Sequence, residues 1–177
     1  IVQSLVGSEM CIRDRYGIPA SQDCLSLIFN KALFDAEGLD YPDSTWTEQD
    51  LLSAAEQLTR QDVQGLALPI KTAYWWFPIQ EGFGGALFDE SGNPTLDSNG
   101  SSESMRWMLD LELEHEVVAT GTQIEGMKNQ FITSKAAMII DGPWNWATYE
   151  DSRLSIGQTL LPTCLLYTSP SPRDSGQ

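Results

Sequence analysis

Basic residues are scarce in this chain. Ten lysines and arginines stand against 25 aspartates and glutamates among 177 residues, so the formal net charge at pH 7 is −15. Nucleic acids and anionic membrane surfaces are bound mainly through clusters of Lys and Arg. We therefore predict that no nucleic acid is a partner. The acidic balance is compatible with a soluble protein that functions outside the cytoplasm.

Cysteine, histidine and long apolar runs are scarce as well. The three cysteines are Cys11, Cys24 and Cys164, and the single histidine is His115. His115 has no partner at the spacing of a catalytic or metal site, so we predict no catalytic residue, no metal and no cofactor. Cys24 lies in an apolar run, where a free cysteine usually packs as a small core side chain. No apolar run approaches the ~18 residues of a membrane-spanning helix.

The two ends of the chain share a coding pattern. One DNA element, translated from opposite strands, can encode both Glu9–Arg15 and Cys164–Ser169, and the correspondence extends outward on both sides. We therefore predict that residues 1–15 and 164–177 are translated sequencing adapter and no part of the native fold. The native part is expected to span residues 16–163. It contains a single cysteine, which excludes a disulfide within it.

The most informative stretch is an apolar run that leads into a Gly-Pro-Trp sequence. Ala136–Ile140 is unbroken and apolar, which is typical of a strand buried on both faces. Gly142 permits a tight turn, and Pro143 suits the first position of a helix, where no backbone N–H is needed. Ligands of α/β sheets bind beyond the carboxyl ends of strands, so Trp144 and Trp146 favour a binding surface here. The alternative is that both indoles belong to the core.

Helical and strand patterns alternate along the rest of the native segment, which indicates an α/β architecture. The clearest helix begins at Thr47, whose side chain can cap it, and has apolar residues at helical spacing as far as Leu58. We expect further helices over residues 31–36, 74–83, 102–117 and 128–132, and strands over residues 24–29, 65–70, 136–140 and 155–161.

Six stretches occur in a distinctive order: Tyr16–Pro19, Leu25–Lys31, Ser44–Glu48, Tyr74–Gly85, Phe131–Trp146 and Ile156–Pro162. In this order they resemble the family 1 extracellular solute-binding proteins of ABC importers, the maltose-binding-protein type. The fifth stretch is similar to the family's Phe-x-x-Gly-Lys-Ala-Ala-Met…Gly-Pro-Trp signature, with Ser134 in place of the usual glycine before Lys135. The resemblance implies one lobe of a two-lobed periplasmic-binding-protein (type II) fold, with a mixed sheet flanked by helices. Residues 16–163 would form this partial ligand-binding lobe, from hinge to hinge.

The resemblance also implies a function. Members of this family deliver a solute to ABC permease subunits in the membrane, so we expect a non-catalytic carrier of a mono- or oligosaccharide that acts as a monomer. Its location would be periplasmic or extracellular, with or without a lipid anchor. Two alternatives stay open on the sequence: a glycosidase-like enzyme, which needs two carboxyl groups about 5–10 Å apart, and a free-standing sugar-binding module.

Aromatic residues head the predicted ligand-binding set, because their rings match the C–H faces of sugars while polar groups match the hydroxyls. By resemblance, Tyr74 and Trp144 occupy the two sugar-stacking positions of this lobe. Trp75 and Trp76 continue the first aromatic stretch and are included, although at least one of them could instead belong to the core.

Three further residues complete the set. Asp141 could accept hydrogen bonds from ligand hydroxyls or could instead interact with the start of the following helix. Glu81 lies two helical turns after Tyr74 on nearly the same face, where the alternative is a solvated surface residue. Trp146 is included as well, although it points about 200° around the helix from Trp144.

Overall fold

The computed structural model describes residues 23–89 and 91–162. Strands and helices alternate along this part of the chain, as the sequence predicts. The strands are β1 (Ser26–Asn30), β2 (Gln64–Ala67), β3 (Ala136–Asp141) and β4 (Ile156–Thr159). The helices are α3 (Lys31–Glu37), α4 (Glu48–Leu58), α5 (Ala73–Gly82), α6 (Asn99–Leu113), α7 (Ile124–Ile132), the 3₁₀ helix η1 (Pro143–Asn145) and α8 (Trp146–Asp151).

The strands form one mixed sheet in the order β2-β3-β1-β4. β3 is parallel to β2 and antiparallel to β1, and β4 pairs antiparallel with the other edge of β1. Every residue of β1 and β3 is buried, which explains why β3 is an almost continuous apolar run in the sequence. The centre of the sheet therefore joins the first described strand to one far along the chain.

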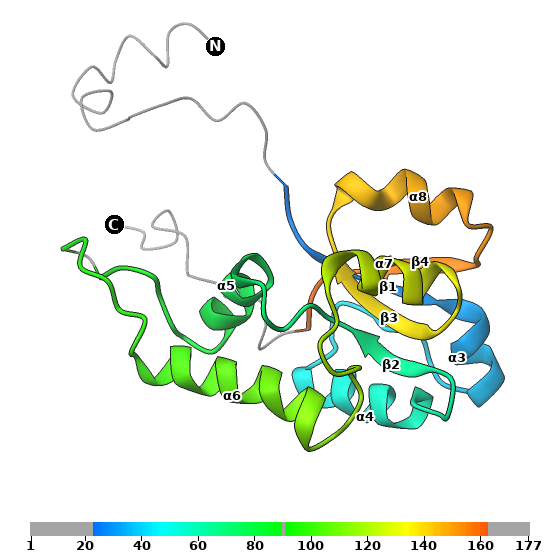
Figure 1. The fold of residues 1–177 in the computed structure, drawn as a ribbon, viewed down its shortest axis with the longest axis horizontal. Coiled ribbons are helices and arrows are strands. Elements are labelled where there is room, and N and C mark those ends of the chain that lie inside the picture. The colour runs from blue at the N-terminus through cyan, green and yellow to red at the C-terminus, as the bar shows by residue number, and fades with distance from the viewer. Residues whose placement is uncertain (1–22, 90, 163–177) are drawn as a thin grey trace, which may run out of the picture.

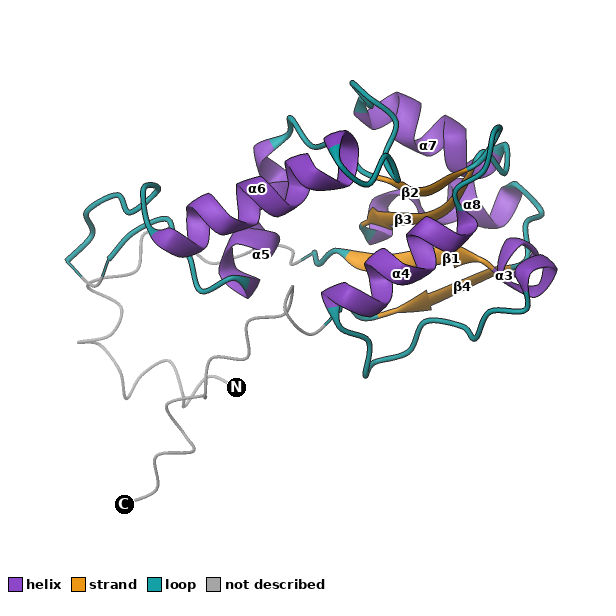
Figure 2. Cartoon of the chain, turned by 90° about the horizontal axis from the view of Figure 1, so that it is seen from below, coloured by secondary structure: helices purple, strands orange, loops and turns teal. Residues whose placement is uncertain are grey.

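Helices cover both faces of this sheet. α4 and α7 both pack against β2 and β3. Figure 1 and Figure 2 show α3 and α4 on one face and α7 and α8 on the other. α5 and α6 pack against each other and extend to one side of the sheet (Figure 1). This arrangement confirms the predicted mixed sheet flanked by helices.

A capping box determines where α4 begins. The Thr47 hydroxyl oxygen accepts a hydrogen bond from the backbone N–H of Asp50 at 3.2 Å, and the Asp50 carboxylate accepts one from the backbone N–H of Thr47 at 2.8 Å. Each side chain thereby satisfies a backbone donor that the helix itself leaves unpaired. The prediction that Thr47 caps this helix is confirmed, and the apolar face behind it is buried as far as Leu58.

Some details of the sequence-based prediction were wrong. Cys24 is exposed rather than buried, because β1 begins only at Ser26 and Cys24 precedes it. α6 ends at Leu113, and Val117 is buried in the loop that follows rather than on the helix. The predicted adapter segments lie outside the described residues and stay predictions. In the part of the chain that the structure describes, no helix combines the length and the apolar character that crossing a membrane requires.

Candidate ligand-binding surface

Asp141, the last residue of β3, is completely buried and holds the turn that follows it. Its Oδ1 accepts a hydrogen bond from the backbone N–H of Gly142 at 2.9 Å, and its Oδ2 accepts one from Asn145 Nδ2 at 2.8 Å. The hydroxyl of Tyr149, in α8, donates to the same Oδ2. These internal donors surround the carboxylate, so Asp141 fixes η1 and the start of α8 to the end of the strand.

Tyr149 is a partner that the sequence analysis missed. Its side chain is fully buried, and burial is the main cause that raises the pKa of its hydroxyl, followed by the hydrogen bond to Asp141. The hydroxyl therefore stays protonated and available as a donor. The signal was present in the sequence, because Asp141, Asn145 and Tyr149 are spaced at intervals of four, which places Asn145 and Tyr149 on one side of a following helix.

Two exposed aromatic rings meet beside this turn. Tyr74, in the first turn of α5, is 46% exposed, and Trp144, in η1, is 45% exposed. Their ring centroids lie 5.7 Å apart with an interplanar angle of 71°, which is an edge-to-face contact. The structure thus brings together two predicted residues from segments that are distant in the sequence. We call Tyr74 and Trp144 the aromatic pair.

Trp75 and Trp76 use their indole N–H groups inside the protein. Trp75 is 4% exposed, and its Nε1 donates a hydrogen bond to the carbonyl oxygen of Ile140 in β3 at 2.7 Å. Trp76 is partly buried, and its Nε1 donates to the hydroxyl of Ser104 in α6 at 2.9 Å. Trp75 therefore connects α5 to the sheet, and Trp76 connects α5 to α6.

Trp146 and Glu81 are the two remaining predicted residues. Trp146 begins α8 and packs against the core, whereas Glu81 is exposed near the end of α5. Of the seven predicted residues, Tyr74 and Trp144 are therefore the two that are exposed and in contact with each other. The ring of the buried Trp75 contacts Tyr74 at a centroid distance of 5.4 Å. Within the described ranges, no three His, Cys, Asp or Glu side chains are grouped so as to hold a metal ion.

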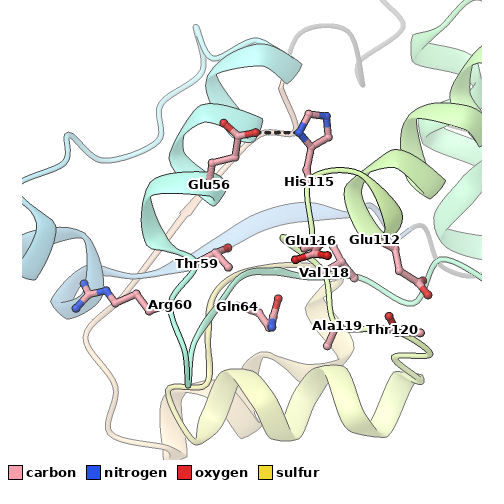
Figure 3. Close-up of a pocket in the computed structure, with 10 residues that line it drawn as sticks. All are labelled: Glu56, Thr59, Arg60, Gln64, Glu112, His115, Glu116, Val118, Ala119 and Thr120. Atoms are coloured by element: carbon pink, nitrogen blue, oxygen red, sulfur yellow. Dashed lines mark hydrogen bonds and ion pairs between the residues drawn. The ribbon is translucent and has the colours of Figure 1, made fainter.

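A hollow lies at the amino ends of β2 and β3. Gln64 lines it and pairs in register with Ala136, so the hollow lies at the end of β3 away from Asp141. Its volume is about 440 Å³, and Figure 3 shows His115 directed toward Glu56, with 2.8 Å between His115 Nδ1 and Glu56 Oε1. Most lining residues are polar or charged: Glu56, Thr59, Arg60, Gln64, Glu112, His115, Glu116, Val118, Ala119 and Thr120. We call this region the polar hollow.

Comparison with known proteins shows which family the chain is similar to. A family model described as bacterial extracellular solute-binding protein matches residues 2–158. Maltodextrin-binding protein MdxE of Bacillus subtilis is 24% identical over 156 residues, which cover 84% of this chain and 37% of the relative. The probable amino-acid ABC transporter periplasmic-binding protein y4oP of Sinorhizobium fredii is 31% identical over 101 residues, which cover 53% of this chain and 23% of the relative.

A solved structure shows the same fold. An ABC transporter solute-binding protein from Thermotoga lettingae, bound with α-D-tagatose, superposes with a TM-score of 0.72 at 26% identity, over 84% of this chain and 41% of that one. The chain therefore spans less than half the length of the relatives that it matches. Such structural neighbours are two-lobed binding proteins, so the prediction of one lobe of this fold is confirmed.

Proposed function

Because this chain belongs to the bacterial extracellular solute-binding proteins, we propose that it is part of the solute-binding component of an ABC importer and that its ligand is a carbohydrate. The family consists of substrate-binding proteins, and the relatives include a maltodextrin-binding protein and a protein bound with tagatose. One observation carries the proposal: the aromatic pair lies exposed beyond the carboxyl end of β3, where ligands of α/β folds bind.

The aromatic pair has the chemistry that a sugar requires. Sugar rings present C–H groups on their faces, and aromatic rings bind such faces by burial and dispersion with little loss of side-chain freedom. Rings inclined at 71° form a corner that can contact one sugar or two linked sugars.

We also propose that the protein is a carrier and not a glycosidase. A glycosidase needs two carboxyl groups about 5–10 Å apart on either side of the scissile bond. Asp141 is the predicted carboxylate nearest to Trp144 in the sequence, and its oxygens are occupied by Gly142, Asn145 and Tyr149. A carboxylate that is buried and bound in this way is suited to hold the turn and not to transfer protons to a substrate.

The complete protein would enclose its ligand between two lobes. This chain covers 37% of the length of MdxE, so a second lobe of comparable kind is part of the proposal. Hinge closure would bring that lobe over the aromatic pair and bury the sugar. The parent would act as a monomer in the periplasm or outside the cell, with or without a lipid anchor, and would pass the sugar to permease subunits in the membrane.

Nuclear magnetic resonance titration of the chain tests the proposal. Maltotriose, D-tagatose and arabino-oligosaccharide are added separately, with leucine as the amino-acid alternative, while the ring resonances of Tyr74 and Trp144 are followed. One lobe supplies only part of the contacts, so we expect a dissociation constant of roughly 1 mM, equivalent to about −4 kcal/mol, for at least one sugar.

The outcomes separate the candidate functions. Saturable shifts of both rings with a sugar that is recovered unchanged support the carrier. Shorter sugars recovered after incubation would show the glycosidase alternative instead. Shifts with leucine alone, or with none of the compounds at tens of millimolar, would overturn the carbohydrate proposal.

A further inference from the structure

The indole of Trp144 lies directly over the backbone of Gly142. A Cβ at position 142 would lie 2.1 Å from Cζ3, 2.2 Å from Cη2 and 2.6 Å from Cε3 of this ring. These separations are far shorter than van der Waals contact, so the ring occupies the space that any other side chain would fill. Gly142 has φ −107° and ψ 176°, in the extended region that all residues except proline adopt freely. The observed position of the ring, and not the backbone conformation, therefore calls for glycine here.

Tyr74 is held by a different device. Trp75, the next residue, is buried and donates its Nε1–H to the carbonyl of Ile140, one residue before the end of β3. This hydrogen bond connects the first turn of α5 to the strand that leads to Gly142 and Trp144. The ring of Trp75 also contacts the ring of Tyr74 at 5.4 Å and an interplanar angle of 71°. Each exposed ring therefore packs against a residue of the lobe: Trp144 against Gly142, and Tyr74 against Trp75.

Building on the proposed sugar-binding function, we propose that Gly142 and Trp75 are positioning residues that hold Trp144 and Tyr74 edge to face before any ligand binds. A ring that is ordered during folding loses no further freedom when a sugar stacks on it, so the cost of ordering is removed from the binding step. Gly142 acts by leaving room for the indole, and Trp75 acts by fixing the start of α5 to β3. Neither residue needs to touch the sugar.

Gly142→Ala tests the first device, with Gly126→Ala as its matched control, because a Cβ at Gly126 meets nothing within 4 Å. The methyl group should displace the indole. In the ligand-free chain, we expect the nuclear Overhauser contacts between the rings of Tyr74 and Trp144 to disappear, while Gly126→Ala keeps them. Maltotriose should bind about tenfold more weakly to the Gly142→Ala chain, which corresponds to about 1.4 kcal/mol.

A double-mutant cycle shows whether Gly142 acts through the ring. In a Trp144→Ala background there is no indole to displace, so adding Gly142→Ala should change the dissociation constant by less than about twofold. An equal loss of affinity in both backgrounds would assign Gly142 a general structural role and overturn the inference. Unchanged ring contacts and unchanged affinity in Gly142→Ala would overturn it as well.

Trp75→Phe tests the second device, because it keeps an aromatic side chain but removes the N–H that binds Ile140. Trp107→Phe is the matched control, since Trp107 packs against Phe83, which follows the last turn of α5, whereas Tyr74 and Trp75 lie in its first turn. We expect Trp75→Phe to weaken the ring contacts of the ligand-free chain and to weaken maltotriose binding about threefold, equivalent to about 0.7 kcal/mol. Equal effects of the two substitutions on the ring contacts would overturn the role of Trp75.

The inference and the proposed function fail in different ways. The ligand-free chain should show the α protons of Gly142 shifted upfield by the indole ring current, and this measurement involves no sugar. The Gly142→Ala variant no longer has the two α protons of a glycine, so it cannot be used for this comparison. Trp144→Ala keeps Gly142 and removes the indole, so it gives the reference chemical shift in the absence of the ring. If the unsubstituted chain lacks the shift, the positioning inference is wrong even if sugar binds. If the shift is present and no sugar binds, the proposed function is wrong and the geometry stands.

Discussion

The two ends of β3 carry opposite kinds of surface although they belong to one strand. At the carboxyl end, the carboxylate of Asp141 is buried and the rings of Tyr74 and Trp144 are exposed. At the amino end, the charged pair of Glu56 and His115 lines the polar hollow and is partly exposed, with side chains 50% and 35% exposed. One end therefore exposes apolar rings and buries charge, whereas the other exposes charge.

This difference shows how burial decides what a charged group does. Water competes for the carboxylate of Glu56, so its contact with His115 contributes little to stability. Water is excluded from Asp141, so each of its donors matters, and removing one leaves buried polar groups unpaired. For aromatic rings, exposure has the opposite meaning: apolar surface that stays in water after folding is available to bind a ligand. This contrast supports the carboxyl end of β3 as the proposed ligand-binding end.

Exchange of a carboxylate for an amide at each end should give the largest contrast. Asp141→Asn turns an N–H₂ group toward donors that require an acceptor, so we expect the free energy of unfolding to fall by about 3 kcal/mol. Glu56→Gln makes the same chemical change at the polar hollow and should cost less than about 0.5 kcal/mol. Urea-induced unfolding of the two variants measures both values. Equal losses would mean that the Asp141 cluster does not hold the fold as the structure indicates.

Removal of an exposed aromatic ring should affect binding and not the fold. We expect Trp144→Ala to weaken maltotriose binding by at least about tenfold, or about 1.4 kcal/mol, because the stacking surface is lost. Phe88→Ala is the matched control, since Phe88 is also exposed, at 60%, but lies in the loop after α5. Titration of both variants by nuclear magnetic resonance gives the two affinities. An unchanged affinity for Trp144→Ala would remove this residue from the proposed site.

Features fixed by neighbouring residues could be predicted from the sequence. The cap by the Thr47 side chain involves only residues within the first turn of the helix, and the end of β3 needs only an apolar run followed by Gly142 and Pro143. The α/β class followed in the same way from the alternation of patterns. These predictions were confirmed because the interactions that decide them are local.

Which of two adjacent aromatic residues is exposed and which is buried could not be predicted in this way. Tyr74 and Trp75 follow one another in the same helical turn, yet one ring is exposed and the other is buried. The difference arises because Trp75 faces the carbonyl of Ile140, which only the assembled sheet brings to that place. The packing of the Trp144 ring over Gly142 likewise depends on a ring orientation that residue types do not specify.

A substitution in the polar hollow should leave sugar binding unaffected if the comparison between the two ends holds. His115→Gln removes the contact with Glu56 Oε1, and a partly exposed pair of this kind contributes less than about 1 kcal/mol to folding. We therefore expect a small decrease in the free energy of unfolding and an unchanged dissociation constant for maltotriose. A decrease in affinity similar to that of Trp144→Ala would mean that the amino end of β3 binds the ligand or affects its binding, and this result would contradict our proposal.

The smallest expected effect concerns α4, whose last turn contributes Glu56 to the polar hollow and whose first turn depends on Asp50. The pKa of Asp50 lies below its usual value of 3.8, because the backbone N–H of Thr47 and then its hydroxyl donate to the carboxylate. A lowered pKa in the folded state means that the carboxylate stabilises the fold fully above pH 3.8 and that this contribution is lost as the pH falls through the lower, folded value. Asp50→Asn cannot titrate, so its urea midpoint should lie below that of the unsubstituted chain near neutral pH. This difference should shrink in acid. A difference that stays constant from about pH 6 to about pH 2 would show that the charge of Asp50 contributes nothing to the cap.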